Sequence, residues 1–179
     1  MTSDWVSTSA PYVSPRRQGQ GDAWSEEAAA QGRKGTQRII RAGEIAPPEE
    51  VAALLGLDDD ETSVVRRRIM YLDGEPTELA DSYYPLSLAG GTPLADPAKI
   101  RGGAVTLLAS LGHSPHRVRE DVRARMPYPA EKAELALGDG EPVLCLTRLV
   151  LDAAAVPFQV DVSVFPAARQ RLRYEMKVG

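Results

Sequence analysis

The stretch SVVRRRIMYLDGEPTELADSYYP, Ser63–Pro85, decides the fold of this chain. Asp73-Gly74 in its middle is a favoured pair for a tight turn between two antiparallel strands. The flanking segments, Ser63–Leu72 and Glu75–Tyr84, then form the two strands. The stretch therefore predicts a β-hairpin, and the rest of the chain can be read outward from it.

A second region of the chain repeats the order of motifs around this hairpin. Glu49–Pro85 has the pattern of a helix, Leu-x-Leu, a glutamate, a hairpin and Ser-Tyr-Tyr-Pro, and Pro129–Pro166 has the same order and ends in Ser-Val-Phe-Pro. Corresponding positions include Leu55 and Leu135, Leu57 and Leu137, Glu61 and Glu141, Arg68 and Arg148, Ser82 and Ser163, and Pro85 and Pro166. This self-similarity predicts two strand–helix–hairpin units related by a pseudo-twofold axis.

The remaining elements fit an α+β fold. Ser25 is the expected N-cap of a short helix that Gly32 ends. Helices are predicted at Ser25–Gln31, from Pro47-Pro48 to Gly56 and at Gly103–Leu111, and further strands at Thr36–Ala42, His116–Met126 and Leu172–Val178. Hairpins with interposed helices predict a mainly antiparallel sheet with helices on one face. Residues 1–21 are rich in Ser, Pro, Gly and Gln without periodicity, which predicts an N-terminal arm or linker before a domain spanning 22–179.

The composition narrows the class of protein. Lys and Arg number 21 against 25 Asp and Glu, a net charge of −4, which argues against a broad surface that grips nucleic acid phosphates. Cys145 is the only cysteine, so an internal disulfide is excluded and a reducing compartment is indicated. No apolar stretch reaches the length of a membrane span and no secretory leader is recognised, so we expect a cytoplasmic protein without membrane contact.

Sequence signatures of common catalytic and cofactor sites are missing. GxGxxG, P-loop, HExxH and CxxC patterns do not occur. His113 and His116 stand in a Ser-Pro loop without a cluster of carboxylates or cysteines, so no metal site is expected there. Cys145 lies in an apolar run, where a thiol packs as a small hydrophobic group. We therefore expect no catalytic residue, no metal and no cofactor.

Two predicted helix starts offer backbone N–H groups of the kind that bind anions. One is Trp24-Ser25-Glu26 and the other is Arg101-Gly102-Gly103-Ala104. Ordinary helix capping is enough to explain each of them alone. Together with Arg68 and its counterpart Arg148, they suggest a small polar or anionic ligand held between the two repeated units.

A series of short motifs resembles a known family. The motifs are, in order, Trp24-Ser25-Glu26, Pro47-Pro48-Glu49-Glu50, Val65-Arg66-Arg67-Arg68, Asp73-Gly74-Glu75-Pro76, Ser82-Tyr83-Tyr84-Pro85, Gly102-Gly103, Ala124-Arg125-Met126-Pro127 and Gly140-Glu141-Pro142-Val143-Leu144. In this order they resemble the UTRA domain of the HutC branch of GntR-type transcription regulators, closest to actinobacterial members, over about Asp22–Val178. The resemblance implies a chorismate-lyase-like α+β fold and a dimer that binds a sugar phosphate, an amino-acid derivative or a similar metabolite and relays this to an N-terminal winged helix-turn-helix.

The chain departs from that pattern at several positions. Family members that bind phosphosugars have a motif similar to Ser-x-Tyr at the start of the central helix, where this chain has Gly103 and Val105. Met70 stands in place of a second arginine, Gln159 in place of a glutamate and Ala168 in place of an aspartate. Fewer fixed charges weaken the case for a phosphorylated ligand. No winged helix precedes the domain in this sequence, so the resemblance implies contact with DNA only through a domain outside it.

The resemblance leads us to expect a non-enzymatic sensor that binds a polar or anionic effector and modulates the arrangement of a homodimer. The ligand-binding residues we expect are Trp24, Ser25 and Glu26 through backbone amides, Arg68 as a charged clamp, Gly103 and Ala104 at the second helix start, and Gln159 from the last hairpin.

Two alternatives remain open at this point. One is a chorismate-lyase-like enzyme, which would combine Arg68 or Arg148 with Glu78 or Asp161. The other is a stand-alone dimerisation partner of full-length regulators. In either case Trp5, Tyr12 and Val13 are costly to leave in water, so we expect the arm to make contacts within or between subunits.

Overall fold

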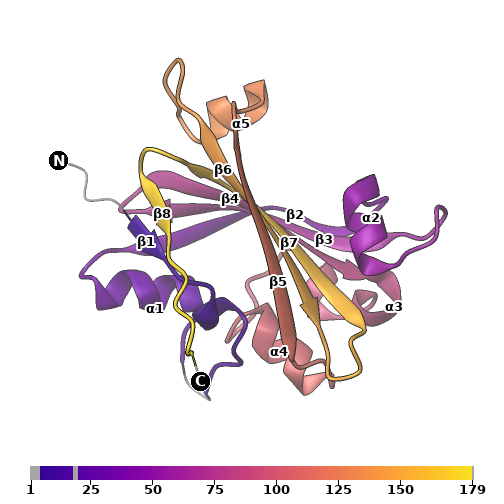
Figure 1. Ribbon diagram of the computed structural model, residues 1–179. Coiled ribbons are helices and arrows are strands. Elements are labelled where there is room, and N and C mark those ends of the chain that lie inside the picture. The colour runs from indigo at the N-terminus through magenta and orange to yellow at the C-terminus, as the bar shows by residue number, and fades with distance from the viewer. Residues whose placement is uncertain (1–4, 18–19, 179) are drawn as a thin grey trace.

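A six-stranded sheet forms the centre of the molecule (Figure 1). The computed structural model describes residues 5–17 and 20–178. The strands of the sheet are β2 (Gly35–Ile45), β3 (Ser63–Leu72), β4 (Glu75–Pro85), β5 (Arg117–Arg125), β6 (Val143–Leu151) and β7 (Pro157–Pro166). They lie in the order β2-β3-β4-β7-β6-β5, and every neighbouring pair is antiparallel. The predicted α+β class with a mainly antiparallel sheet is confirmed.

The strand order shows the internal repeat. One half consists of β2, α2 (Glu49–Leu55), β3 and β4, and the other of β5, α5 (Pro129–Glu134), β6 and β7. The halves meet where β4 pairs with β7. In the first hairpin Asp73 and Gly74 have φ angles of 53° and 89°, the left-handed region that a tight hairpin turn requires. Each half therefore contains a hairpin set by its local turn, and the pairing of the equivalent strands β4 and β7 joins the two halves.

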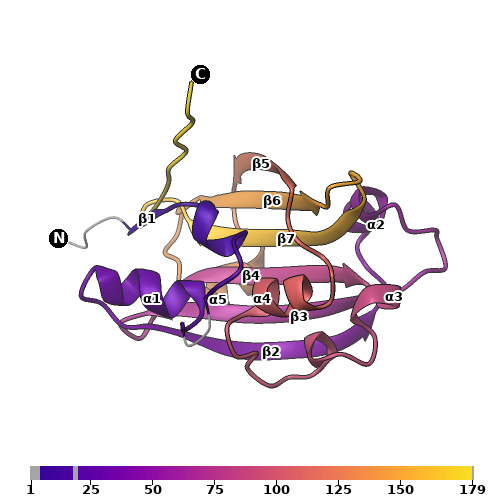
Figure 2. The ribbon, with the colours of Figure 1, turned by 90° about the horizontal axis from the view of Figure 1, so that it is seen from below.

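Helices cover both faces of the sheet, which corrects the expectation that they lie on one. Val64 packs with Leu108 on one face, and the adjacent Val65 packs with Leu55 on the other. Because consecutive strand residues point to opposite faces, two adjacent buried valines need cover on both sides. Helices α1 (Ala23–Ala30), α3 (Leu86–Ala89) and α4 (Ala104–Ser110) and the 3₁₀-helix η2 (Pro93–Ala95) pack on the first face, and α2 and α5 pack on the second. Figure 2 shows α1 and α4 in front of the sheet.

Two predicted boundaries were wrong. Helix α1 begins at Ala23, and its N-cap is Asp22 rather than Ser25, because the Asp22 carboxylate accepts a hydrogen bond from the Ser25 N–H at 2.9 Å. The last strand, β8, covers Gln170–Leu172 instead of Leu172–Val178. It pairs only with the three-residue strand β1 (Trp5–Ser7) among the described residues, so its length is limited by that partner.

The described part of the N-terminal arm packs against the domain. Strand β1 runs parallel to β8, and the 3₁₀-helix η1 (Ala10–Tyr12) follows it. The Trp5 side chain is buried and meets the Trp24 ring edge-on, with ring centroids 5.2 Å apart and planes at 68°. Such aromatic contacts add to the free energy gained by burying the rings. Residues 1–4 and 18–19 of the predicted arm lie outside the described residues.

None of the helices within residues 5–17 and 20–178 is long and apolar enough to cross a lipid bilayer.

Candidate ligand-binding site

A cavity of about 120 Å³ lies on the face of the sheet that α1 and α4 cover. Strands β3 and β4 of the first half and β6 and β7 of the second contribute to it, so the cavity lies between the two repeated units. Its other walls are α1, the segment before α4 and the N-terminal arm. Side chains alternate along a strand, and Arg66, Arg68 and Met70 of β3 therefore share this cavity.

The two arginines of β3 that reach the cavity have different roles. Arg66 donates hydrogen bonds to the carbonyl oxygens of Pro93, Leu94, Asp96 and Ala98, at 2.5–3.1 Å. Burial lowers the pKa of the Arg66 guanidinium, and these carbonyls supply its acceptors. Arg66 therefore holds the loop at residues 93–98 against the sheet.

Arg68 is only partly satisfied. Its Nη2 donates to Ser82 Oγ at 2.9 Å, whereas its Nε is buried and has no hydrogen-bond acceptor. None of the ion pairs formed by the described residues includes Arg68. A positive group with an unused donor thus faces the cavity.

The β6 and β7 side of the cavity holds a network of acidic and basic groups. Gln159 Nε2 donates to both Asp161 carboxylate oxygens, at 2.9 and 2.8 Å. Arg148 Nη1 lies 3.6 Å from Asp161 Oδ2, and Arg148 Nε donates to Glu120 Oε1 at 2.5 Å. Burial opposes the charge on Arg148, but these two carboxylates outweigh it and raise the pKa of its guanidinium. The positive charge of Arg148 is therefore already balanced by carboxylates of the protein.

Glu78 of β4 also lines the cavity. Burial raises the pKa of the Glu78 carboxyl, although a hydrogen bond with Ser163 and the charges of Arg68 and Arg148 oppose this. A carboxyl with a raised pKa keeps its proton to higher pH and carries less negative charge. Burial likewise raises the pKa of the nearby Tyr84 hydroxyl to about 12, so this group stays neutral.

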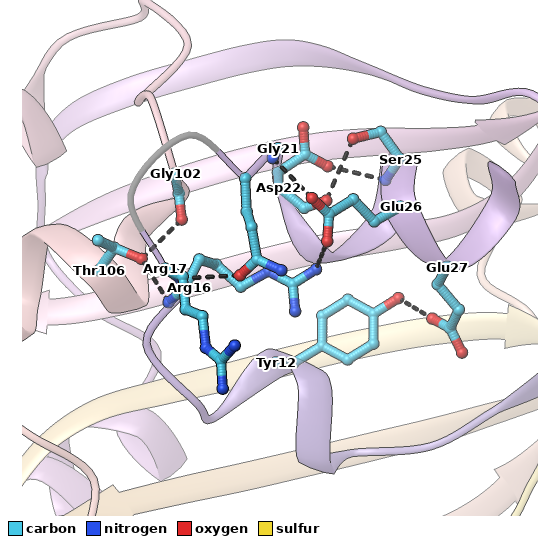
Figure 3. A network of polar contacts seen from close by, with 11 residues as sticks. Tyr12, Arg16, Arg17, Gly21, Asp22, Ser25, Glu26, Glu27, Gly102 and Thr106 are labelled. Carbon is cyan, nitrogen blue, oxygen red and sulfur yellow. Dashed lines mark hydrogen bonds and ion pairs between the residues drawn. The ribbon is translucent and has the colours of Figure 1, made fainter. Parts of the chain in front are cut away.

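Polar contacts join the arm to α1 beside the cavity, which Tyr12 and Arg16 of the arm line (Figure 3). The Tyr12 hydroxyl donates to Glu27 Oε2 at 2.5 Å, and the Arg16 guanidinium pairs with Glu26. The Arg16 backbone N–H donates to Thr106 Oγ1 of α4 at 3.0 Å. The arm therefore spans from α1 to α4 over the cavity.

The structure brings together five of the seven expected site residues. Trp24, Arg68, Gly103, Ala104 and Gln159 all line the cavity. The Trp24 indole N–H is not free, since it lies within hydrogen-bond distance of the Thr36 and Tyr71 carbonyl oxygens, at 3.1 and 3.2 Å. Trp24 can therefore offer a ligand its ring surface but not this donor.

Ser25 and Glu26 do not line the cavity, which corrects the expected role of their backbone amides. The Ser25 N–H donates to the Asp22 carboxylate and the Glu26 N–H to the Asp22 carbonyl at 3.2 Å. The N-cap residue has thus taken the place expected for an anion at this helix start.

Sequence reasoning missed the cavity residues Asp22, Lys99 and Arg16. Lys99 Nζ lies 2.8 Å from Asp22 Oδ2, so these two residues form an ion pair in the wall of the cavity. No periodic signal marks these residues, because two precede the sheet and one lies in an irregular loop. Asp22 alone had a recognisable signal, as an aspartate immediately before a helix start.

The structure also places the groups that the sequence singled out as possible metal ligands or nucleophiles. Within the described ranges no cluster of three or more His, Cys, Asp or Glu side chains is placed to hold a metal ion. Cys145 is buried, and burial raises the pKa of its thiol.

The fold and cavity define a class of protein: an antiparallel α+β domain with a small charged pocket between two pseudo-symmetric halves, an arrangement suited to binding a small molecule. Within this class, the chain belongs to the UTRA domain family, because residues 30–171 match the model of the UTRA domain. The recognition made from the motifs is confirmed.

Sequence relatives are named as transcription regulators. An uncharacterised HTH-type transcriptional regulator of Streptomyces coelicolor is 28% identical over 146 residues, which cover 80% of this chain and 53% of that protein. The HTH-type transcriptional regulator GgaR of Escherichia coli K12 is 26% identical over 140 residues, which cover 78% of this chain and 54% of that protein. The chain therefore spans about half the length of these relatives.

Solved structures share the fold. The effector domain of PhnF from Mycobacterium smegmatis matches with a TM-score of 0.74 and 20% identity, over 92% of this chain and 98% of that domain. The C-terminal domain of the histidine utilization repressor from Pseudomonas syringae matches with a TM-score of 0.66 and 17% identity, over 81% of this chain and all of that domain, 100%. These matches agree with the predicted chorismate-lyase-like fold.

Proposed function

We propose that this chain is the effector-sensing domain of a GntR-type transcription regulator and that its cavity binds a compact anionic metabolite. The names of the relatives support the regulator class. Because the chain spans about half of their length, a DNA-binding part, a homodimer and a cytoplasmic location all belong to this proposal. Regulation then requires that the ligand bind one arrangement of the dimer more tightly than another.

The Arg68 guanidinium is the observation that carries the proposal. Its Nε is buried without an acceptor, and it lacks an ion-pair partner among the described residues. A buried donor without an acceptor costs about 1–3 kcal/mol. An oxyanion would supply the acceptor and the opposite charge together. The cavity is therefore better suited to an anionic ligand than to a neutral one.

The volume of the cavity restricts the size of the ligand. An apolar cavity of about 150 Å³ holds a benzene molecule, and this cavity has about 120 Å³. A ligand with one oxyanion group and a short remainder fits such a space. Gln159 and Ser163 offer polar contacts to the remainder, and Ile39 and Met70 offer apolar ones.

An enzyme of the chorismate lyase type is the second candidate, because Arg68, Arg148, Glu78 and Asp161 do meet in one cavity. Asp161 is already bound by Gln159 and paired with Arg148, whereas Glu78 has a hydrogen bond with Ser163 and forms none of the ion pairs among the described residues. Fold likeness alone is a poor guide to activity. Incubation with chorismate should yield no product at enzyme-like rates, and product formation would replace the sensor proposal by this one.

Replacing the Arg68 guanidinium tests the proposed site. Metabolites from panels of sugar phosphates, amino acids and acyl compounds should be screened by thermal shift, and Kd measured by calorimetry for those that raise Tm. Arg68→Met should weaken binding at least about tenfold, since a charge-assisted hydrogen bond contributes about 1.5–3 kcal/mol.

Arg67→Met is the matched control. Arg67 is the neighbouring residue of β3, points to the opposite face and pairs there with Asp81 at 2.8 Å. The Arg67→Met variant should change Tm but leave the Kd of the ligand within about twofold of its value for the unmodified protein. The site assignment is wrong if no compound raises Tm, or if both variants bind like the unmodified protein.

A further inference from the structure

Among residues 5–17 and 20–178, two guanidinium Nε atoms are buried without a hydrogen-bond partner, and both belong to residues that line the cavity. One is Arg68 of β3, already described. The other is Arg16, which comes from the N-terminal arm and is distant from Arg68 in the sequence. Two cationic side chains from separate elements, each with an unused donor, therefore belong to the wall of one cavity.

Contacts on two sides hold Arg16 in place. Its Nη2 pairs with the Glu26 carboxylate, which also accepts a hydrogen bond from the Gly21 N–H at 2.8 Å. Its backbone N–H binds Thr106 Oγ1, and the Thr106 hydroxyl in turn donates to the Gly102 carbonyl at 2.8 Å. Figure 3 shows these contacts around the arm. They leave the Nε–H without an acceptor although the side chain is only 16% exposed.

Strand β3 offers no second cation of this kind. Arg66 is consumed by four carbonyl oxygens, and Met70, two residues after Arg68 on the same face, is apolar. Arg148 is paired with carboxylates. Lys99 is paired with Asp22. Arg16 is therefore the cavity cation that resembles Arg68 in having an unused buried donor.

We propose that Arg16 is a second anion-binding residue, so that a carboxylate or phosphate group accepts hydrogen bonds from Nε–H of Arg16 and of Arg68 together. This inference rests on the proposed function and adds to it. An oxyanion has two or more acceptor oxygens and can satisfy both donors at once. The bound anion ties the arm to the sheet, and by linkage the closed arm raises the affinity for the anion.

The test compares four chains by calorimetry at constant ionic strength, with inorganic phosphate and acetate as probes of the two oxyanion classes. Arg16→Ala should weaken binding of the preferred probe by about tenfold or more. Arg17→Ala is the matched control, because Arg17 is the next arm residue and its side chain is exposed; Kd should stay within about twofold. Arg68→Met should weaken binding as well.

Glu26→Gln separates an anion contact from a purely structural clasp. If Arg16 only fastened the arm through Glu26, Glu26→Gln would weaken binding as Arg16→Ala does. If Arg16 contacts the anion, Glu26→Gln should weaken binding less than Arg16→Ala does, because the guanidinium is retained and the Arg16 N–H bond to Thr106 still anchors the arm.

Hydrogen exchange of the arm gives a readout independent of affinity. Saturating phosphate or acetate should slow exchange of the Arg16 amide, which is bound to Thr106, in the unmodified protein but not in Arg68→Met. If Arg68→Met abolishes binding while Arg16→Ala binds like Arg17→Ala, this inference is overturned and the proposed function stands. If the unmodified protein binds neither probe, the anion site itself is refuted and the inference with it.

Discussion

At the scale of single residues, the environment of Glu78 opposes ionisation of its carboxyl. It lies among the polar groups of the cavity, and burial raises the pKa of its carboxyl. The folded protein therefore holds this proton to higher pH than the unfolded chain does. The contribution of Glu78 to the free energy of unfolding is greatest below its unfolded pKa and falls as pH rises through the raised folded pKa.

Glu78→Gln should remove this pH-dependent fall in the free energy of unfolding, because an amide does not ionise. The unfolding free energy of the variant relative to the unmodified protein should increase as pH rises above the ordinary range of a glutamate, by about 1.4 kcal/mol for each unit that separates the two pKa values. Thermal unfolding at a series of pH values measures it. Glu75→Gln, an exposed residue of the same strand, should show a difference that does not change with pH. A flat profile for Glu78→Gln would show that burial of Glu78 does not affect stability.

At the scale of elements, Gly35 lets α1 lie directly on β2. A Cβ at this position would come within 2.9 Å of both Ala28 Cβ and Trp24 Nε1. Close packing of this kind also keeps Trp24 beside the cavity. The contact therefore links the stability of α1 to the shape of the ligand site.

Gly35→Ala should destabilise the protein by about 1–3 kcal/mol, because a packed helix must shift to admit the methyl group. For a domain of this size, each kcal/mol lowers Tm by about 2–4 °C. Gly138→Ala is the control, since the nearest atom there is the flexible Glu141 carboxylate at 3.2 Å. Equal Tm values for the two variants would contradict direct contact between α1 and β2.

At the scale of the whole molecule, the arm joins distant parts of the chain. Strand β1 pairs with β8, Trp5 packs on Trp24, and Ser9 Oγ accepts a hydrogen bond from Arg148 Nη2 at 3.1 Å. The arm thus connects the C-terminal segment, α1 and the cavity. Removal of the arm would expose the Trp24 ring and leave β8 unpaired.

A chain that begins at Gly21 should therefore have a lower Tm than the intact chain, and the intact chain should be a homodimer. Light scattering gives the mass of both chains, and thermal unfolding gives their stability. Burial of an aromatic side chain such as Trp5 contributes about 1–3 kcal/mol. A monomeric intact chain would refute the dimer, and identical mass and Tm after truncation would refute a role for the arm.

The amino-acid sequence by itself determined the six strands of the main sheet and their order along the chain, but not β1, α3 or the two 3₁₀-helices. The turn at Asp73-Gly74 and the repeat that ends at Pro166 depend on local chemistry, and the structure confirms both. Alternation along β3 also places Arg68 on one face together with Met70. Local rules reach this far because each involves residues that are close in the chain.

Only the tertiary structure decided which segments cover the sheet and close the cavity. Arg16 and Thr106 meet through a backbone hydrogen bond although they are 90 residues apart. Asp22, not Ser25, caps α1, which removed two amides from the expected site. The physical reason differs between the two: Arg16 and Thr106 lie on segments that only folding brings together, whereas the cap of α1 was a local choice between two residues that can both cap a helix.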